Sequence, residues 1–233
     1  MPLNNSYDEQ EVIKAIATAL ETFYANLIEK IDGLNIKKVM KRKNPYLYRA
    51  KAMQSATEIV ESVLNAFVSS SEETIFGNCF FEPIAIAASG GNKALAEGID
   101  IMIQDNATNT ISAIAVKSGP SVFNADSKKR QEQNFMAASK LAQQAKARYE
   151  AYIGYCYGKK KDSGRGKPKM YQELAGKRFW AELTGDEDFY IKIIGYMGTM
   201  PEKYVADYKE SYNKAANRLV REFSNSFCKE DGS

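Results

Sequence analysis

Two short apolar segments, separated by a turn and each carrying one charged residue, constrain the fold of this chain more than any other feature. Residues 99–103 carry Asp100, and residues 111–117 end in Lys117. Residues 105–109 between them are rich in Asp, Asn and Thr, which favour turns because their side chains bond to nearby backbone groups. The pattern therefore predicts a β-hairpin that brings an acid and an amine together at one end of a sheet.

A charge in each of two apolar strands can serve structure or chemistry. Burying an unpaired charge is costly, so Asp100 and Lys117 are expected to pair, and a salt bridge at a sheet edge would account for both. The alternative is a phosphodiesterase site. Asp100 would bind Mg²⁺, because this hard cation prefers carboxylate oxygen. Lys117 would orient or activate the attacking water and stabilise charge on the phosphate.

A metal site of this kind needs a second acidic ligand. In the (D/E)-x-K pattern of one large nuclease superfamily, that acid lies two residues before the lysine, on the same face of the strand. This position is Ala115 here, and alanine cannot bind metal. The acid could instead come from Glu132, at the start of a helix predicted over residues 127–149, with Gln133 as a weaker candidate. Otherwise the acid was replaced, by divergence or to trap an inactive complex; we favour the relocated acid.

Composition excludes several classes of function. Of 233 residues, 44% are apolar and 26% charged, which is ordinary for a soluble globular protein. The net charge is only +3, so local clusters must carry any argument for nucleic-acid binding. Histidine is absent, which excludes Ser-His-Asp and Cys-His catalysis, histidine–metal nuclease motifs and most zinc enzymes. No Gly-rich phosphate loop is visible, so no nucleotide cofactor is expected.

Cysteine usage and hydropathy bear on the compartment. The three cysteines, Cys79, Cys156 and Cys228, are odd in number and widely spaced, as expected for reduced core residues of a cytosolic protein. No segment has the uncharged apolar length that a membrane span needs. The N-terminus is polar and acidic, unlike a signal peptide. We therefore expect a cytoplasmic protein.

The remaining periodicities predict mainly helices. Apolar residues recur at helical spacing over several segments, and the serines and acids of residues 69–73 are typical of a helix start. The predicted helices are residues 8–31, 52–67, 69–89, 127–149, 176–183, 186–197 and 202–227, with a third strand over 152–157. We therefore predict an α/β fold in which helices flank a small mixed sheet. It would form a single domain, 1–233, with a mainly helical annex (1–68), a catalytic core (69–200) and a C-terminal helix (201–233).

Some charged and aromatic residues have both structural and functional interpretations. Glu73 would be either a first-turn acid that interacts with the helix dipole or an outer carboxylate of the metal site. The basic residues 37–43 would form either a solvated face or contacts to DNA phosphates. The basic, glycine-rich residues 158–169 would form either an exposed loop or the same kind of contacts. Trp180 is expected to anchor the core rather than to stack on bases.

A set of short motifs occurs in order across most of the chain. They are residues 43–51, 69–77, 99–100, 116–120, 154–159 and 179–180. In these motifs the sequence resembles the type II restriction endonucleases of the PmeII type, within the PD-(D/E)XK nuclease superfamily. The resemblance covers roughly residues 40–200.

The resemblance implies a Mg²⁺-dependent homodimer of a prokaryotic cytoplasm that cuts both strands of double-stranded DNA at a short specific site. Asp100 matches the family's metal aspartate and Lys117 its catalytic lysine, whereas Ala115 departs from the acidic form of the motif. Some restriction endonucleases carry the missing glutamate on the following helix, at a spacing from the lysine close to that of Glu132.

Together, the motif and the resemblance define a full set of candidate residues. The catalytic candidates are Asp100, Lys117 and Glu132, and the metal candidates are Asp100, Glu132, Glu73 and the backbone carbonyl of Val116. The DNA-binding candidates are Ser118, Asn124, Lys128, Lys129, Arg130, Lys160 and Arg165. Two other functions stay open: a DNA-binding protein of the same fold that has lost catalysis at Ala115, and a helical scaffold that does not bind nucleic acid.

Overall fold

The computed structural model describes residues 3, 6–90, 92–94, 96–160 and 169–229, and its chain divides into two compact units. The sheet unit comprises residues 1–19 and 77–198, and the helical unit comprises residues 20–76 and 199–233. Helices α1 (Glu9–Asp32) and α4 (Ala56–Cys79) each contribute residues to both units. Whether the chain folds as the single domain predicted above stays a prediction.

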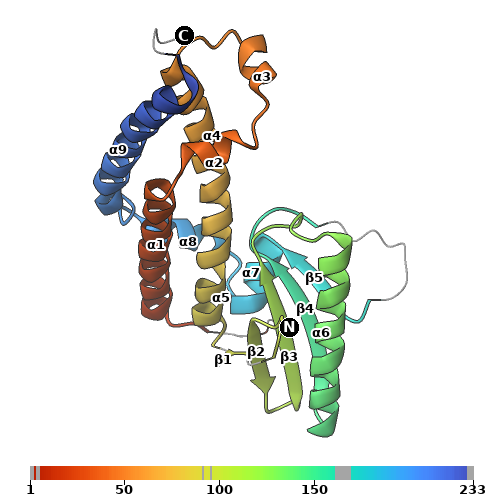
Figure 1. The fold of residues 1–233 in the computed structure, drawn as a ribbon. Coiled ribbons are helices and arrows are strands. Elements are labelled where there is room, and N and C mark those ends of the chain that lie inside the picture. Colours follow the sequence, from red (N-terminus) through yellow and green to blue (C-terminus); the bar gives the residue numbers. More distant parts are fainter. Residues whose placement is uncertain (1–2, 4–5, 91, 95, 161–168, 230–233) are drawn as a thin grey trace. The chain divides into compact units, whose positions relative to one another are not determined.

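A five-stranded mixed sheet forms the centre of the sheet unit, which confirms the predicted α/β class (Figure 1). The strands lie in chain order, with β1, β2 and β3 antiparallel and β3, β4 and β5 parallel. They are β1 (Asn92–Lys93), β2 (Ile101–Asp105), β3 (Thr110–Lys117), β4 (Arg148–Tyr155) and β5 (Gln172–Ala175). The predicted hairpin is β2–β3, and Asp100 lies one residue before β2.

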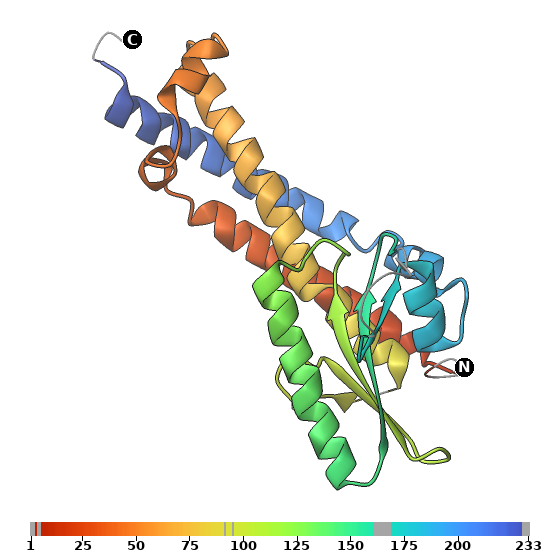
Figure 2. The same cartoon turned by 90° about the vertical axis from the view of Figure 1, so that its right-hand side faces the viewer.

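Helices cover both faces of this sheet (Figure 2). On one face, Phe135 of α6 (Ala125–Gln144) belongs to a buried cluster with Ala115 and Ile153 of the central strands. On the other face, Phe179 of α7 (Lys177–Thr184) lies so close to Gly154 that a Cβ there would meet its ring at 2.0 Å. Two more helices complete the unit, α5 (Phe81–Ser89) and α8 (Phe189–Met197).

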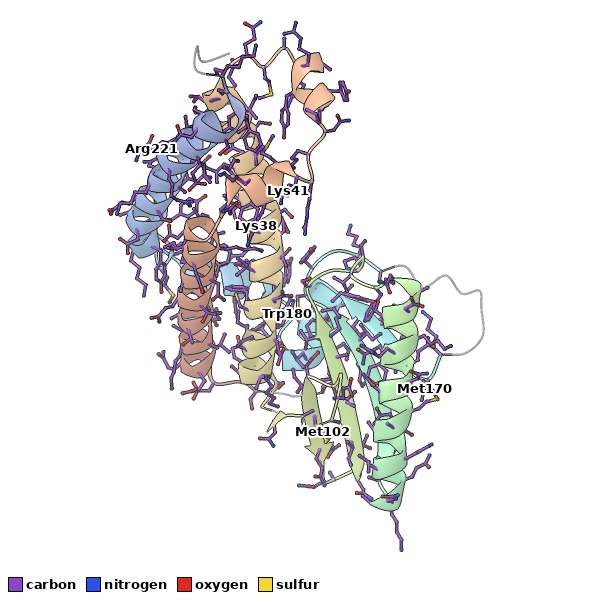
Figure 3. The ribbon with its side chains drawn as sticks, viewed as in Figure 1. Lys38, Lys41, Met102, Met170, Trp180 and Arg221 are labelled. Atoms are coloured by element: carbon purple, nitrogen blue, oxygen red, sulfur yellow. The ribbon has the colours of Figure 1, made fainter. Side chains whose placement is uncertain are left out.

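The side chains of the sheet unit confirm one expectation about its core, the position of Trp180. Trp180 of α7 is 1% exposed and donates from its indole nitrogen to the Cys156 carbonyl, 2.8 Å away, so it anchors the core as predicted (Figure 3). Cys156 is buried, and it is a free thiol, as are Cys79 and Cys228. Within the part of the chain that the structure describes, no helix is long and apolar enough to cross a membrane.

The helical unit has its own core. It is built from α2 (Ile36–Met40), α3 (Pro45–Ala50), α9 (Glu202–Phe227) and parts of α1 and α4. Leu27, Leu64 and Leu219 are buried together in it, as the helical spacing of apolar residues predicts. The predicted limits of the C-terminal helix, residues 202–227, coincide with those of α9.

Several predicted helix ends are wrong, since the helix predicted from residue 52 begins at Ala56 and the helix predicted over 69–89 is divided between α4 and α5. Residues 69–73 do not start a helix, because α4 continues through them; Ser71 is 2% exposed on the core side, and the Thr74 hydroxyl bonds back to the Ser70 carbonyl. Burial of the helix face therefore overrides the cap-like sequence. The helix predicted over 127–149 ends at Gln144, because Lys146 adopts a positive φ of 55° and the chain enters β4 at Arg148.

Candidate active site

The structure brings Asp100 and Lys117 together at one end of the β2–β3 hairpin. The Asp100 Oδ2 atom accepts hydrogen bonds from the Val116 backbone N–H, at 2.6 Å, and from the Lys117 Nζ atom, at 3.3 Å. Lys117 Nζ also donates to the Val116 carbonyl oxygen, at 2.9 Å. Both side chains stay partly open to solvent, with 19% of Asp100 and 26% of Lys117 exposed. The pair is therefore a salt bridge that a ligand can still reach.

A pocket of about 230 Å³ opens beside this pair. Helical residues line one side of it and the ends of the β2–β3 hairpin line the other. The lining residues are Gly77, Asn78, Phe81, Glu82, Asp100, Val116, Lys117, Ser118 and Val122. The pocket therefore offers two carboxylates, one amide and one ammonium group to a ligand.

The segment before Asp100 is held in place by α6. Gly98 adopts a positive φ of 69°, which favours glycine, and a Cβ at this position would displace the Asn134 side-chain amide, 2.0 Å away. Gln131 donates from Nε2 to the Gly98 carbonyl at 2.7 Å. The Asp100 backbone N–H then donates to the Ile114 carbonyl at 2.9 Å. These contacts fix where the Asp100 carboxylate enters the pocket.

Ala115 is not among the residues that line the pocket. It is fully buried in the same cluster as Phe135 and Ala138, whereas Val116 lines the pocket. Successive residues of a strand project to opposite faces, so the side chains of Ala115 and Val116 point to different sides of β3. A carboxylate at position 115 would therefore replace a methyl group in the core, where an unpaired charge is costly.

Glu132, the predicted second ligand, is not among the residues that line the pocket. Its Oε1 atom accepts a hydrogen bond from the Tyr171 hydroxyl at 3.3 Å, while its neighbour Gln131 reaches Gly98. Gln133 is exposed. The structure does not bring Glu132 to Asp100 and Lys117, and its role as a metal ligand stays a prediction.

Glu82 is the acid that sequence reasoning missed. It lies in the first turn of α5, lines the pocket, and its Oε1 atom is 3.2 Å from the Lys93 ammonium. A signal existed, since Pro83 follows it directly and proline favours the first turn of a helix. Glu73, for which the sequence allows both a helix-dipole role and an outer metal-site role, is exposed on α4 within the helical unit, and it is not a first-turn residue.

The predicted DNA-binding residues lie in different surroundings. Ser118 lines the pocket. Asn124 caps α6 in a capping box with Ser127, so its side-chain oxygen accepts the Ser127 backbone N–H at 2.8 Å. Lys128, Lys129 and Arg130 follow in the first turns of α6, and the last two are exposed. Arg165 lies outside the described residues.

Lys160 is part of a compact cluster around Glu173. The Glu173 side chain is 5% exposed, pairs with both Lys160 and Lys169, and accepts from the Tyr155 hydroxyl at 2.8 Å. Burial raises the pKa of Glu173, but the hydrogen bonds from Lys169 and Tyr155 and the charge of Lys160 outweigh burial, so its pKa is lowered. Lys160 also lies 3.4 Å from the carbonyl oxygen of Pro120, three residues after Lys117.

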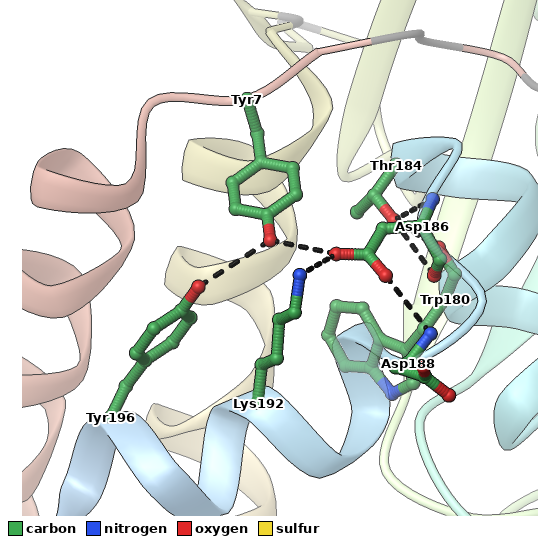
Figure 4. Close-up of polar contacts among 7 residues, drawn as sticks. All are labelled: Tyr7, Trp180, Thr184, Asp186, Asp188, Lys192 and Tyr196. Atoms are coloured by element: carbon green, nitrogen blue, oxygen red, sulfur yellow. Dashed lines mark hydrogen bonds and ion pairs between the residues drawn. The ribbon is translucent and has the colours of Figure 1, made fainter.

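A second polar cluster in the sheet unit involves Tyr7, Asp186, Lys192 and Tyr196 (Figure 4). The Tyr7 hydroxyl donates to Asp186 Oδ2 at 2.9 Å, and Lys192 pairs with the same carboxylate. The Lys192 hydrogen bond, stronger than the opposing effect of burial, lowers the pKa of Asp186. Because each of these groups is satisfied by another, the cluster is best explained as a tie between the N-terminal segment and α8.

The chemistry of the pocket suits a hard cation such as Mg²⁺. Among the residues that the structure describes, no three Asp, Glu or Cys side chains gather to hold a metal by themselves. Magnesium does not require such a cage, because it keeps several waters and binds through one or two carboxylates together with substrate phosphates. Asp100 and Glu82 provide those carboxylates in one pocket. The nearby Cys156 thiol is buried, and burial raises its pKa, which favours the neutral thiol over the thiolate that would bind a metal.

Comparison with protein-family models provides a match over most of the chain. The family model described as "Type II restriction endonuclease EcoO109I" matches residues 10–204, which is most of the chain. No curated protein matches the sequence significantly. The matched span includes the pocket residues and both charged strands of the hairpin.

Proposed function

The chain belongs to the family of the type II restriction endonuclease EcoO109I, and from this membership we propose that it is a Mg²⁺-dependent enzyme that cuts double-stranded DNA at a specific sequence. The observation that supports catalysis most directly is the Asp100–Lys117 pair at the pocket, 3.3 Å apart and partly exposed. An acid, an ammonium group and a second carboxylate in one open pocket suit metal-assisted phosphodiester hydrolysis. Assignment to the PmeII type and to the PD-(D/E)XK superfamily remains part of the proposal.

The metal would be held by Asp100 and one further carboxylate. Glu82 lines the same pocket as Asp100, so it is the first candidate; Glu132, which bonds to Tyr171, is the alternative. The Val116 carbonyl is a further candidate oxygen, although it accepts from Lys117 in this structure. When bound, Mg²⁺ would neutralise phosphate charge and make its bound water more acidic.

The residues of the chain would then position the reactants. The Lys117 ammonium is fixed between Asp100 and the Val116 carbonyl, so it can hold the attacking water and stabilise charge on a phosphate oxygen. In the reaction, a bond forms between the water oxygen and phosphorus as the bond from phosphorus to the leaving sugar oxygen breaks. One site cuts one strand, so we propose a homodimer with two-fold symmetry for cutting both strands.

Digestion of unmethylated phage DNA tests this function. We expect discrete fragments with Mg²⁺ and none with EDTA. The second ligand is identified by comparing Glu82→Gln with Glu132→Gln, each assayed over a Mg²⁺ titration. Loss of cutting, or a raised Mg²⁺ requirement, in only the Glu82 variant would identify Glu82, and the opposite result would identify Glu132.

The second candidate function is a DNA-binding protein that has lost catalysis. The burial of Ala115 favours it, because a metal ligand cannot occupy that position without disturbing the core. Duplex binding without cutting at any Mg²⁺ concentration would establish this alternative. Restoring an acid through Ala115→Glu would not test this alternative, since the new charge would be buried in the core.

A further inference from the structure

A strongly basic segment lies in the helical unit, and we name it the α2–α3 arm, residues 36–51. It contains seven cations and no acid. They are Lys37, Lys38, Lys41, Arg42, Lys43, Arg49 and Lys51. All seven are exposed, and within the described chain none of them forms an ion pair. Figure 3 labels Lys38 on α2 and Lys41 directly after the end of this helix.

The arm has an ordered anchor, so its cations are presented on a defined surface. Ile36 is fully buried and Tyr48 is 8% exposed, and both belong to the core of the helical unit. Asn35 caps α2 by accepting the Lys38 N–H at 3.0 Å, and Asn44 caps α3 by accepting the Tyr46 N–H at 3.0 Å.

The turn before α2 is fixed by α9. The Arg218 guanidinium donates to the Leu34 carbonyl at 2.8 Å and to the Asp32 carbonyl at 3.0 Å. The Asp32 carboxylate in turn accepts from the Ser211 hydroxyl at 2.7 Å. An arginine thus satisfies carbonyls at the end of α1 and holds the entry to the arm.

Two large apolar side chains on the arm are exposed beside these cations. Tyr46 is 82% and Leu47 55% exposed, while their neighbour Tyr48 takes the buried position. Large apolar side chains exposed next to each other offer apolar contact area to a partner. An aromatic and an aliphatic side chain flanked by Lys43 and Arg49 are suited to contact the sugars and bases of a duplex whose phosphates the cations neutralise.

We propose that the α2–α3 arm binds the phosphate backbone of duplex DNA, with Tyr46 and Leu47 contacting the groove. This inference rests on the endonuclease function proposed above, and it gives the enzyme a DNA-binding surface outside the sheet unit. Charge complementarity favours DNA over other partners, because seven unpaired cations in sixteen residues would release many counterions from a duplex.

The test is the salt dependence of duplex affinity, measured by fluorescence anisotropy in EDTA so that no cutting occurs. The arm variant is Lys38→Gln, Lys41→Gln and Arg42→Gln. The control removes three exposed cations from α9, through Lys203→Gln, Lys209→Gln and Arg221→Gln. The plot of log affinity against log salt has a negative slope, and we expect its magnitude to decrease by about 2–3 in the arm variant. Affinity should be reduced about 10- to 100-fold at moderate salt. The control should change neither.

A second variant separates the apolar contacts from the charge. Tyr46→Ala with Leu47→Ala should lower affinity about 5- to 50-fold without changing the salt slope. Both side chains are exposed, so circular dichroism should show an intact fold.

Three outcomes would overturn the inference. If the wild-type protein binds and cuts DNA but both arm variants bind like wild type, the arm is not a DNA surface and the endonuclease function stands. If the Tyr46 and Leu47 variant changes the oligomeric mass instead of the affinity, or if the arm cations affect only binding to phosphatidylserine vesicles, the arm has a different partner. If the wild type neither binds nor cuts duplex DNA, the endonuclease function fails together with this inference.

Discussion

The sheet unit and the helical unit carry their charged side chains in different ways. In the sheet unit, Asp100, Lys117 and Glu173 are mostly covered and paired, with side-chain exposures of 19%, 26% and 5%. In the helical unit, the cations of the α2–α3 arm are exposed and, among the described residues, have no ion pairs. Covered pairs hold charge at fixed positions, which suits chemistry on one phosphate. Exposed, unpaired cations suit binding through counterion release. We therefore expect catalysis and DNA affinity to be separable by mutation.

The largest effect is expected at Asp100. Asp100→Asn keeps the size of the side chain but removes the negative charge that pairs with Lys117 and would bind Mg²⁺. We expect single-turnover cleavage to fall about 100- to 1,000-fold or more, with duplex affinity in EDTA changed less than about three-fold. The matched control is Asp105→Asn, an exposed turn residue at the other end of β2, which should cut like wild type. Equal losses in the two variants would show that Asp100 acts only through the fold.

The next largest effect concerns the two cores. Phe135→Ala in the sheet unit and Leu64→Ala in the helical unit each remove a fully buried side chain. We expect losses of about 3–5 kcal/mol for Phe135 and about 2–5 kcal/mol for Leu64 in the free energy of unfolding, from urea denaturation. Because Phe135 packs with Ala115 behind the pocket, its variant should also lower cleavage at temperatures where it stays folded. A Leu64 variant with the larger loss of cleavage would contradict the assignment of catalysis to the sheet unit.

A third comparison uses pH. Because its hydrogen bonds and neighbouring lysines outweigh burial, Glu173 has a lowered pKa in the folded state. Such a group stabilises the fold above its unfolded pKa, about 4.3, and loses that contribution as pH falls through the folded-state pKa. The stability difference between wild type and Glu173→Gln should therefore be constant near neutral pH and shrink below about pH 4.

The control for this measurement lies in the helical unit. Glu210 pairs with Lys214 on α9, and its hydrogen bond to Lys214 lowers its pKa as well, but both side chains are mostly exposed. Glu210→Gln should thus change stability little at any pH, since solvent screens an exposed pair. If the pH dependence of the Glu210 variant exceeded that of the Glu173 variant, burial would not govern these pairs.

The smallest effect separates a real helix cap from an apparent one. Asn124 caps α6 in the sheet unit, whereas Ser69 lies inside α4 and is exposed. Asn124→Ala should cost about 1 kcal/mol in the free energy of unfolding. Ser69→Ala should change it by less than about 0.5 kcal/mol, because alanine is the better helix former. A cost for Ser69→Ala equal to that for Asn124→Ala would mean that a helix does begin at residues 69–73.

The contrast between units also explains which features the sequence could predict. The hairpin that joins Asp100 to Lys117 follows from local alternation and turn residues, and the long amphipathic helix α9 follows from its spacing. The error at residues 69–73 arose because serines and acids signal a cap unless tertiary burial keeps the helix intact, as it does at Ser71.

The composition of the pocket could not be predicted, because it depends on contacts that are distant in sequence. Glu82 lines the same pocket as Asp100 because α5 packs on the hairpin, and Gln131 rather than Glu132 faces Gly98 because of the rotation of α6. A shift of one residue on a helix turns a side chain by about 100°, which sequence spacing alone cannot resolve. The exposure of the arm cations could not be predicted from the sequence either, because the cations of a basic run can equally form ion pairs with acids on the surface.

The most direct test of the central claim measures cleavage and binding on the same samples of one variant, Lys117→Met. Methionine keeps the length of the side chain but removes the ammonium group that bonds Asp100 and the Val116 carbonyl. We predict that Mg²⁺-dependent cleavage is lost while duplex affinity in EDTA, and its salt slope, stay close to wild type. Cleavage at the wild-type rate in this variant would contradict the account, because the chemistry would then not reside in the Asp100–Lys117 pocket.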